Sequence, residues 1–347
     1  MAVDLTGGLD IAREYVFAEP PKIDQMRDAV NMWLWDDRGE IGFPRVAVEA
    51  TAPNWSEHEL NMSLTFPDGR ILRHWEPGPA HSPIGPKGLA TMFGAGPMSF
   101  ECIEPFHRYR TTFKGTAVDT SFEALSHARR DTRRVELEYE VECETVAPPW
   151  VQGAMATGLE HVATSGGDKG DLMGGDRLEQ LMKVTGRVKL DGKAQTFTGG
   201  GNRIRRQGIR IFQGFWGHCW QATAFPSGRA FGYIAYPPRD DRQPTYNEGY
   251  IFTGDGGLIP AKVVEAPWLH DLQFSGEDVS CVLESALGRT RITAQLAMAA
   301  PSLHMDATGV QNFPPLLQGV ARYTWDGETA YGMIERSNLH HRVTLPK

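Results

Sequence analysis

The residues best suited to chemistry lie in an aromatic segment in the second half of the chain. Alternation along residues 211–221 places Trp216, His218 and Trp220 on one face of a predicted strand. Two indole rings around one imidazole form an apolar cage with a single proton carrier, which suits protonation of an alkene or shielding of a carbocation. A core histidine packed between tryptophans is the structural alternative, and the sequence leaves both open.

A carboxylate on the last predicted strand is the second candidate. Tyr331, Met333, Glu335 and Ser337 alternate there and share one face. A carboxylate among methionine and aromatic positions is expected to have a raised pKa, which suits a general acid. The alternative is a salt bridge to a neighbouring arginine. We therefore take Glu335 and His218 as candidate catalytic residues.

Two adjacent polar residues begin an otherwise apolar strand, and they supply the third candidate. Glu179 and Gln180 are neighbours, so one of them must face inward. A buried group of this kind needs a partner or a role. We take Glu179 as a candidate catalytic residue and Gln180 as a candidate substrate-binding residue.

Residues 201–210 are unusually basic, with arginines at positions 203, 205, 206 and 210. Such a cluster could grip a carboxylate, a phosphate or a coenzyme A tail, or it could pair with the acidic excess elsewhere in the chain. Tyr246 follows a proline-rich loop, and His107 belongs to a polar cluster in the first half. The full set of candidate substrate-binding residues is Trp216, Trp220, Arg203, Arg210, Tyr246, Gln180 and His107.

Common cofactor motifs are missing from the sequence. There is no Walker loop, nucleophile elbow, zincin motif or calcium loop, and the glycine runs at 94–96 and 199–201 lack the strand–helix setting of a dinucleotide site. The cysteines at 102, 143, 219 and 281 are too widely spaced for a structural zinc site, so buried thiols are expected. We expect no metal.

Charge and hydropathy exclude some classes of partner. The 35 basic and 43 acidic residues give a net charge of −8, which argues against a sequence-independent nucleic-acid binder. No run of 18 apolar residues predicts a membrane span, and no signal peptide is visible, so a cytoplasmic protein is expected. The oligomeric state stays open, with a homodimer as one arrangement.

The elements that must hold these residues are predominantly strands. Alternating apolar residues with turn signals predict evenly spaced short strands and few short helices, which is typical of β-barrels and sandwiches. Two halves of this kind indicate an all-β chain of two tandem antiparallel lipocalin-like barrels, 1–185 and 186–347. Long loops are expected at 76–96 and 147–177, with a short helix around 151–159. Predicted turns include Pro67-Asp68-Gly69-Arg70, Asp191-Gly192-Lys193 and Trp325-Asp326-Gly327-Glu328.

Several short motifs carry a resemblance to a known group of proteins. The chain resembles the tandem lipocalin-like superfamily that includes carotenoid 1,2-hydratase (hydroxyneurosporene synthase), the AttH-like proteins, and related hydratases, terpenoid cyclases and Diels–Alderases. The motifs are Glu179-Gln180 with Gly186-Arg187-Val188 and Asp191-Gly192, Gly201-x-Arg203 with Gly208-x-Arg210, the Trp216/Trp220 strand, and Trp325-Asp326-Gly327-Glu328 with Tyr331-Gly332 and Glu335-Arg336.

The resemblance implies two barrels, an apolar ligand chamber, and no metal or organic cofactor. Many relatives continue Asp-His-Ser-Trp-Gly after Gly-x-Arg, whereas this chain has Ile204-Arg205-Arg206-Gln207-Gly208. The acid and imidazole of that motif are absent here, so any proton donor must come from elsewhere.

Three functions remain open at this stage. The first is a cofactor-free hydratase, lyase, isomerase or cyclase that acts by acid–base chemistry on a terpenoid, polyketide, steroid or aromatic compound. The second is a non-catalytic carrier of a hydrophobic ligand, which would lack a proton donor within reach. The third is a carbohydrate-active domain, which would need two carboxyl groups about 5–10 Å apart in one cleft.

Overall fold

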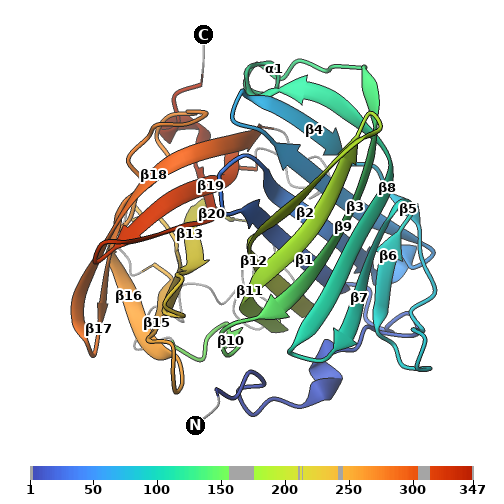
Figure 1. Cartoon of the computed structure of the whole chain (residues 1–347), viewed down its shortest axis with the longest axis horizontal. Coiled ribbons are helices and arrows are strands. Elements are labelled where there is room, and N and C mark those ends of the chain that lie inside the picture. The colour runs from blue at the N-terminus through green and yellow to red at the C-terminus, as the bar shows by residue number, and fades with distance from the viewer. Residues whose placement is uncertain are drawn as a thin grey trace.

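The chain folds into two antiparallel barrels that lie side by side (Figure 1). The structure is a computed structural model, and it describes residues 3–155, 176–209, 212, 214–240, 245–303 and 313–345. The first barrel runs from blue to yellow-green on the right of Figure 1, and the second runs from yellow to red on the left. This arrangement confirms the all-β, two-barrel fold expected from the sequence.

Eight strands close the first barrel in the order β1-β2-β3-β4-β8-β9-β11-β12, with β12 returning to β1. Four shorter strands pair with its members: β5 (Gly78–Pro79), β6 (Met92–Ala95), β7 (Met98–Glu104) and β10 (Trp150–Val151). The barrel strands are β1 (Met26–Asp36), β2 (Gly42–Thr51), β3 (Glu57–Thr65), β4 (Arg70–His74), β8 (Arg108–Ser121), β9 (Arg134–Thr145), β11 (Asp176–Leu190) and β12 (Lys193–Ile209).

Eight consecutive strands close the second barrel, with β20 pairing back to β13. One short α-helix, α1 (Phe122–Ser126), and the 3-10 turns η1 (Ile11–Glu14), η2 (Ala52–Asn54) and η6 (His340–Arg342) complete the described elements. The second-barrel strands are β13 (Gly217–Ala224), β14 (Ala230–Ala235), β15 (Asn247–Phe252), β16 (Ile259–Glu265), β17 (Cys281–Ser285), β18 (Gly288–Ser302), β19 (Leu316–Trp325) and β20 (Glu328–Asn338).

Local sequence explains why these segments are strands. In β9, buried and exposed residues alternate along the whole strand, because every second side chain points into the barrel. Asp191 and Gly192 both adopt positive φ angles, 48° and 83°, in the two-residue turn between β11 and β12. Asp326 and Gly327 do the same between β19 and β20, with φ angles of 49° and 81°. An Asp-Gly pair favours this hairpin turn, so these turns were predictable.

The boundary between the barrels lies later than residue 185. That residue lies within β11, which pairs with β9 on one side and β12 on the other. The second barrel begins at β13, so the chain crosses between barrels from Ile209 to Gly217. The hairpin β11–β12 closes the first barrel, and sequence alternation alone does not reveal which barrel a hairpin joins.

Other local expectations have mixed outcomes. The long loop expected at 76–96 contains β5 and β6. Residues 150–155 form β10 and a turn; the rest of the helix expected around 151–159 lies outside the described residues.

The interiors of both barrels are packed with their own side chains. Residues such as Phe113 and Tyr139 fill the first barrel, and Tyr233 and Tyr323 belong to the cluster that fills the second. The expected apolar chamber is therefore absent from these interiors in the described parts of the chain. A third buried cluster lies between the barrels and includes Trp33, Trp220, Met298, Val320 and Met333.

The interface between the barrels positions the third cluster. β13 and β20 of the second barrel pack against β1, β11 and β12 of the first, and β18 and β19 pack against β2. Alternation divides each strand: Val30, Met32 and Leu34 face the interior of the first barrel, whereas Trp33 faces the second barrel. A strand of this kind is buried on both faces, which makes the interface part of the core.

Candidate functional site

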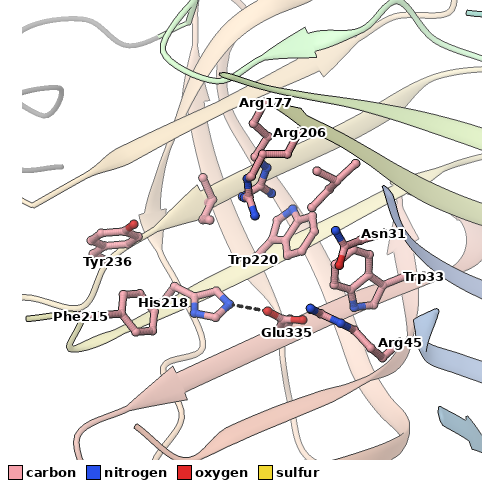
Figure 2. Close-up of a pocket in the computed structure, with 12 residues that line it drawn as sticks. Asn31, Trp33, Arg45, Arg177, Arg206, Phe215, His218, Trp220, Tyr236 and Glu335 are labelled. Carbon is pink, nitrogen blue, oxygen red and sulfur yellow. Dashed lines mark hydrogen bonds and ion pairs between the residues drawn. The ribbon is translucent and has the colours of Figure 1, made fainter. Parts of the chain in front are cut away.

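A small pocket lies between the two barrels (Figure 2). Its cavity measures about 30 Å³, enough for one or two water molecules. Each barrel contributes half of its lining. The first barrel supplies Asn31, Trp33, Arg45, Arg177, Ile204 and Arg206, and the second supplies Phe215, His218, Trp220, Ile234, Tyr236 and Glu335.

Strand pairing brings the two proton carriers together. β13 pairs with β20 so that His218 lies opposite Ser337 and Trp220 lies opposite Glu335. His218 Nε2 lies 3.0 Å from Glu335 Oε1 (Figure 2), and His218 Nδ1 lies 2.7 Å from Ser337 Oγ. Gln318 on β19 donates from its amide nitrogen to Glu335 Oε2 at 2.5 Å. Both proton carriers are therefore held in defined orientations.

The surroundings of Glu335 keep it ionised. Burial raises the pKa of this carboxyl group, but the hydrogen bond and charge of His218, the charge of Arg45 and the amide of Gln318 outweigh burial and hold the pKa at about 2. This direction is opposite to the one expected from the sequence, because the pairing of β13 with β20 brings His218, diagonally across the pair, into contact with the carboxylate. Glu335 is thus an ionised hydrogen-bond acceptor at neutral pH.

Aromatic rings and guanidinium groups form the opposite wall. The rings of Trp33 and Trp220 meet edge to face with centroids 4.5 Å apart. The guanidinium carbon of Arg45 lies 5.5 Å from the Trp33 ring centre, and that of Arg177 lies 4.7 Å from the Trp220 ring centre. Figure 2 shows Arg45 pointing toward Glu335 and Arg177 beside Arg206 above Trp220. The wall is therefore both aromatic and cationic.

Glu179 lies just behind this wall. It forms a buried ion pair with Arg177, and Asn202 donates to its second carboxylate oxygen at 3.1 Å. Burial raises the pKa of Glu179, although Arg177, Asn202 and Arg206 counteract that effect. Glu179 does not itself line the pocket, so its contact with the site passes through Arg177.

The aromatic cage expected from the sequence is only partly formed. His218 and Trp220 line the pocket together, as alternation predicted. Trp216 precedes β13, and Gly217 has a φ of 130°, which breaks the alternation. The Trp216 indole instead packs on Tyr236 and donates to the carbonyl of Pro237 at 2.9 Å. Phe215 and Tyr236 provide the pocket's other aromatic surface.

Several other candidate residues lie away from the pocket. Arg203 points into the first barrel, where it donates to Glu14 at 2.6 Å, to Tyr109 at 2.9 Å and to Gln180 at 3.2 Å. Gln180 also donates to the carbonyl of Leu5 at 2.9 Å. These contacts hold the N-terminal segment against the first barrel and favour the structural interpretation of both residues.

The remaining candidates have separate surroundings. Tyr246 donates to Glu248, a fully buried carboxylate that also accepts from Trp150 Nε1 at 3.1 Å. His107 is half-buried in the loop that enters β8 and does not line the pocket. Arg210 lies outside the described residues.

Sequence reasoning missed most of the first-barrel wall. Asn31, Trp33 and Arg45 lie on two strands that alternation predicted correctly, but nothing in their spacing marks them as neighbours of His218. Ile204, which follows Arg203 of the Gly-x-Arg motif, lines the pocket, so this position supplies no proton carrier. Gln318 was also missed, because its role depends on β19 pairing with β20.

Two further searches bear on the site. Among the described residues, no group of three or more His, Cys, Asp or Glu side chains is arranged to hold a metal ion. None of the helices in the described ranges combines the length and apolar character needed to cross a bilayer.

Comparisons with known proteins agree on the architecture. A family model described as a domain of unknown function (DUF7064) matches residues 17–340. No match was found among curated protein sequences.

Solved structures with this fold include an AttH-like protein from Nitrosomonas europaea, with a TM-score of 0.58, 15% identity, and coverage of 90% of this chain and 92% of that one. CghA has a TM-score of 0.50 at 10% identity, covering 94% and 96%. Kievitone hydratase from Nectria haematococca has a TM-score of 0.47 at 9% identity, covering 94% of each chain. The AttH-like structure and CghA confirm the expected two-barrel fold.

Proposed function

The chain belongs to the DUF7064 family, and for this two-barrel member we propose a cofactor-independent enzyme that performs acid–base chemistry on a hydrophobic small molecule at the pocket between the barrels. The observation that carries the proposal is the buried contact between His218 and Glu335 at 3.0 Å in the pocket wall. A terpenoid, polyketide, steroid or aromatic compound is the proposed substrate class, and hydration, elimination, isomerisation and cyclisation are the candidate reactions.

The two residues have complementary roles. Glu335 is a carboxylate and accepts a proton, whereas His218 in its imidazolium form donates one. The Ser337 hydroxyl accepts from a protonated Nδ1 or donates to a bare one, so it tolerates both protonation states of His218. Burial excludes water and strengthens these interactions. Phe215 and Tyr236 offer an apolar surface for the body of the substrate.

Glu179 acts in this proposal as a positioning residue. Its carboxylate holds Arg177 in place over the Trp220 ring, which fixes one side of the pocket. It is a catalytic candidate only if the substrate displaces Arg177, because Glu179 does not line the cavity.

The experiment is a conversion assay with matched variants. Purified protein is incubated with β-hydroxy ketones and their dehydrated enones on aromatic and terpenoid skeletons, and products are followed by mass spectrometry. We expect Glu335→Gln and His218→Ala to lower turnover about 100-fold or more, the scale of losing an acid–base group. Glu265→Gln and His341→Ala, on exposed residues, are the controls. Unchanged turnover in both site variants, with native circular dichroism, would remove the assignment.

A non-catalytic carrier is the second candidate, and one observation favours it. Both ring nitrogens of His218 and both carboxylate oxygens of Glu335 already have hydrogen-bond partners. A carrier would return each compound chemically unchanged after long incubation across a pH series, while still binding it. An enzyme would convert at least one compound, so the same assay separates the two.

A further inference from the structure

Three buried N–H groups in the pocket wall lack acceptors. Within the described part of the chain, Trp33 Nε1, Trp220 Nε1 and Arg177 Nε have no hydrogen-bond partner. The two tryptophans are only 1% and 2% exposed, so bulk water does not solvate them. A buried donor without an acceptor is costly, so these N–H groups favour an occupant of the pocket that accepts hydrogen bonds, a role that one or two water molecules fill when no ligand is bound.

The same wall disfavours the binding of a positively charged ligand. The guanidinium groups of Arg45 and Arg177 each lie over an indole ring, so those ring faces are already occupied by a cation. Three arginines line the pocket against one carboxylate, Glu335. Glu179 forms an ion pair with Arg177 from behind the wall. Arg45 has no ion-pair partner within 4 Å among the described residues, and its charge remains directed into the pocket.

We propose that this pocket binds an oxyanion of the substrate, a carboxylate or an enolate, so that the reaction develops negative rather than positive charge. This inference rests on the proposed function, because it concerns the substrate of the same site. Trp33, Trp220, Arg45 and Arg177 supply the hydrogen bonds and the charge that hold the anionic oxygen. Hydrogen bonds to an ionised group are stronger than those between two neutral groups.

The cavity is large enough for the polar head group of a substrate but too small for the whole molecule. About 30 Å³ accommodates a carboxylate or a carbonyl oxygen with its carbon, but no ring system. The apolar body of the substrate then lies on the side of Phe215 and Tyr236, across the pocket from Arg45 (Figure 2), and these buried side chains must move to admit it. This orientation places the carbon next to the head group beside Glu335.

An elimination through an enolate balances with the groups present. Glu335 takes the proton from the carbon α to the carbonyl, and the electron pair of that C–H bond moves to the carbonyl oxygen as an enolate. The enolate then expels the β-hydroxyl group, which takes a proton from the His218 imidazolium and leaves as water. Proton transfer from Glu335 to His218 along their hydrogen bond restores the resting pair. Hydration is the reverse sequence.

The test compares two probes of nearly equal shape and different charge. Naphthalene-2-carboxylate is an anion at neutral pH, and 2-acetylnaphthalene is its neutral ketone counterpart. Their dissociation constants for the full chain are measured by calorimetry at low and high salt. We expect the carboxylate to bind at least about tenfold more tightly, and high salt to reduce that preference.

Variants identify the groups responsible. Arg45→Met should weaken carboxylate binding about tenfold and ketone binding less than about twofold, because only the anion uses the charge. Trp33→Phe and Trp220→Phe keep an aromatic ring and remove one N–H each, and both should weaken carboxylate binding. Arg291→Met removes an exposed charge, and Trp75→Phe removes an indole whose N–H donates to Ser63 instead, so these are the controls.

Three outcomes overturn the inference: equal affinity for the two probes, no binding of the carboxylate, or equal affinities in Arg45→Met and Arg291→Met. If one of these occurs while His218→Ala still abolishes conversion, the oxyanion site is wrong and the proposed enzyme stands. If the carboxylate binds as expected but no compound is converted, the binding site stands and the acid–base function fails.

Discussion

At the scale of single residues, Ser337 explains how a buried histidine is kept in a usable orientation. Its hydroxyl accepts from the backbone N–H of His218 at 3.1 Å and also contacts Nδ1 of the same residue. The imidazole is therefore held at one nitrogen by Ser337 and at the other by Glu335. Such positioning by neighbouring hydrogen bonds is what converts a titratable residue into part of a site.

The depressed pKa of Glu335 predicts an acid-dependent loss of stability. Its folded-state pKa of about 2 lies below the value of about 4.5 expected in the unfolded chain, so the stabilisation is complete above pH 4.5 and is lost as the pH falls toward 2. The group contributes about 3 kcal/mol across that window. Urea unfolding between pH 3 and 6 should show a steeper decline for wild type than for Glu335→Gln. Parallel stability curves for the two proteins would contradict the assignment.

The partners of individual site residues were largely beyond the sequence. Alternation placed Trp216, His218 and Trp220 on one face of one strand, and Tyr331, Met333, Glu335 and Ser337 on one face of another. His218, Trp220 and Glu335 do line the pocket together, whereas Trp216 precedes β13 and does not line it. Alternation does not reveal that β13 pairs with β20. This pairing brings His218 to Glu335 and lowers the pKa of Glu335. A prediction made from one strand at a time therefore assigned that pKa in the wrong direction.

At the scale of elements, the glycine run in β12 determines how closely two strands of the first barrel approach. A Cβ on Gly199 would lie 1.9 Å from the carbonyl oxygen of Trp35, and one on Gly200 would lie 2.6 Å from its indole nitrogen. Only a strand without side chains at these positions fits against β1 here. The run that failed as a nucleotide motif thus has a packing role.

This close approach predicts a strong effect of a single methyl group. Gly199→Ala should destabilise the protein by at least about 2 kcal/mol, because the clash is with backbone that cannot move without shifting β1. The measurement is the midpoint and slope of urea unfolding. Gly257→Ala is the control, because a Cβ there meets nothing within 4 Å. Equal stability of the two variants would show that β12 has room to shift.

Element positions were the most predictable part of the fold. The strand expected at 42–51 matches β2, and the hairpin around Asp68-Gly69 joins β3 to β4. Short-range alternation and turn residues carry this information. The basic run at 201–210 was not foreseen as strand, because arginines on both faces hide the pattern: Arg203 and Arg205 form buried ion pairs inside the first barrel, and Arg206 lines the pocket.

At the scale of the whole molecule, Glu248 links the two barrels. This carboxylate lies on β15 of the second barrel, and it accepts hydrogen bonds from the segment that follows the first barrel's β9. The donors are Trp150 Nε1 at 3.1 Å, the backbone N–H of Gly153 at 2.8 Å and that of Met155 at 2.8 Å. One buried anion thus satisfies donors contributed by the neighbouring barrel.

Loss of this anion should destabilise the assembly of the barrels. Glu248→Ala leaves several buried donors without an acceptor, and we expect a cost of about 3–5 kcal/mol. Thermal unfolding followed by calorimetry measures the effect. Glu265→Ala on the neighbouring strand β16 is the control, because that side chain is exposed and forms only a long ion pair with Arg291. Similar melting temperatures for the two variants would mean that Glu248 does not hold the barrels together.

The location of the pocket belongs to this largest scale, because the sequence implied an apolar chamber without deciding whether it lies inside a barrel or between the two. In each strand at the interface, one set of alternating side chains faces the barrel interior and the other set faces the neighbouring barrel, and both sets are apolar. Nothing in a single strand separates the two burial environments. The distinction appears only when β1 and β12 are seen against β13 and β20.

The chain crosses from one barrel to the other once among the barrel strands, between Ile209 and Gly217, and this crossing separates two halves of the pocket wall with different chemistry. Arginine side chains come from before it, and the histidine–glutamate pair comes from after it. Under the proposed function, a chimera of two family members joined at this crossing would exchange the pocket's arginines and keep the His218–Glu335 pair, so each barrel contributes a separate part of the site.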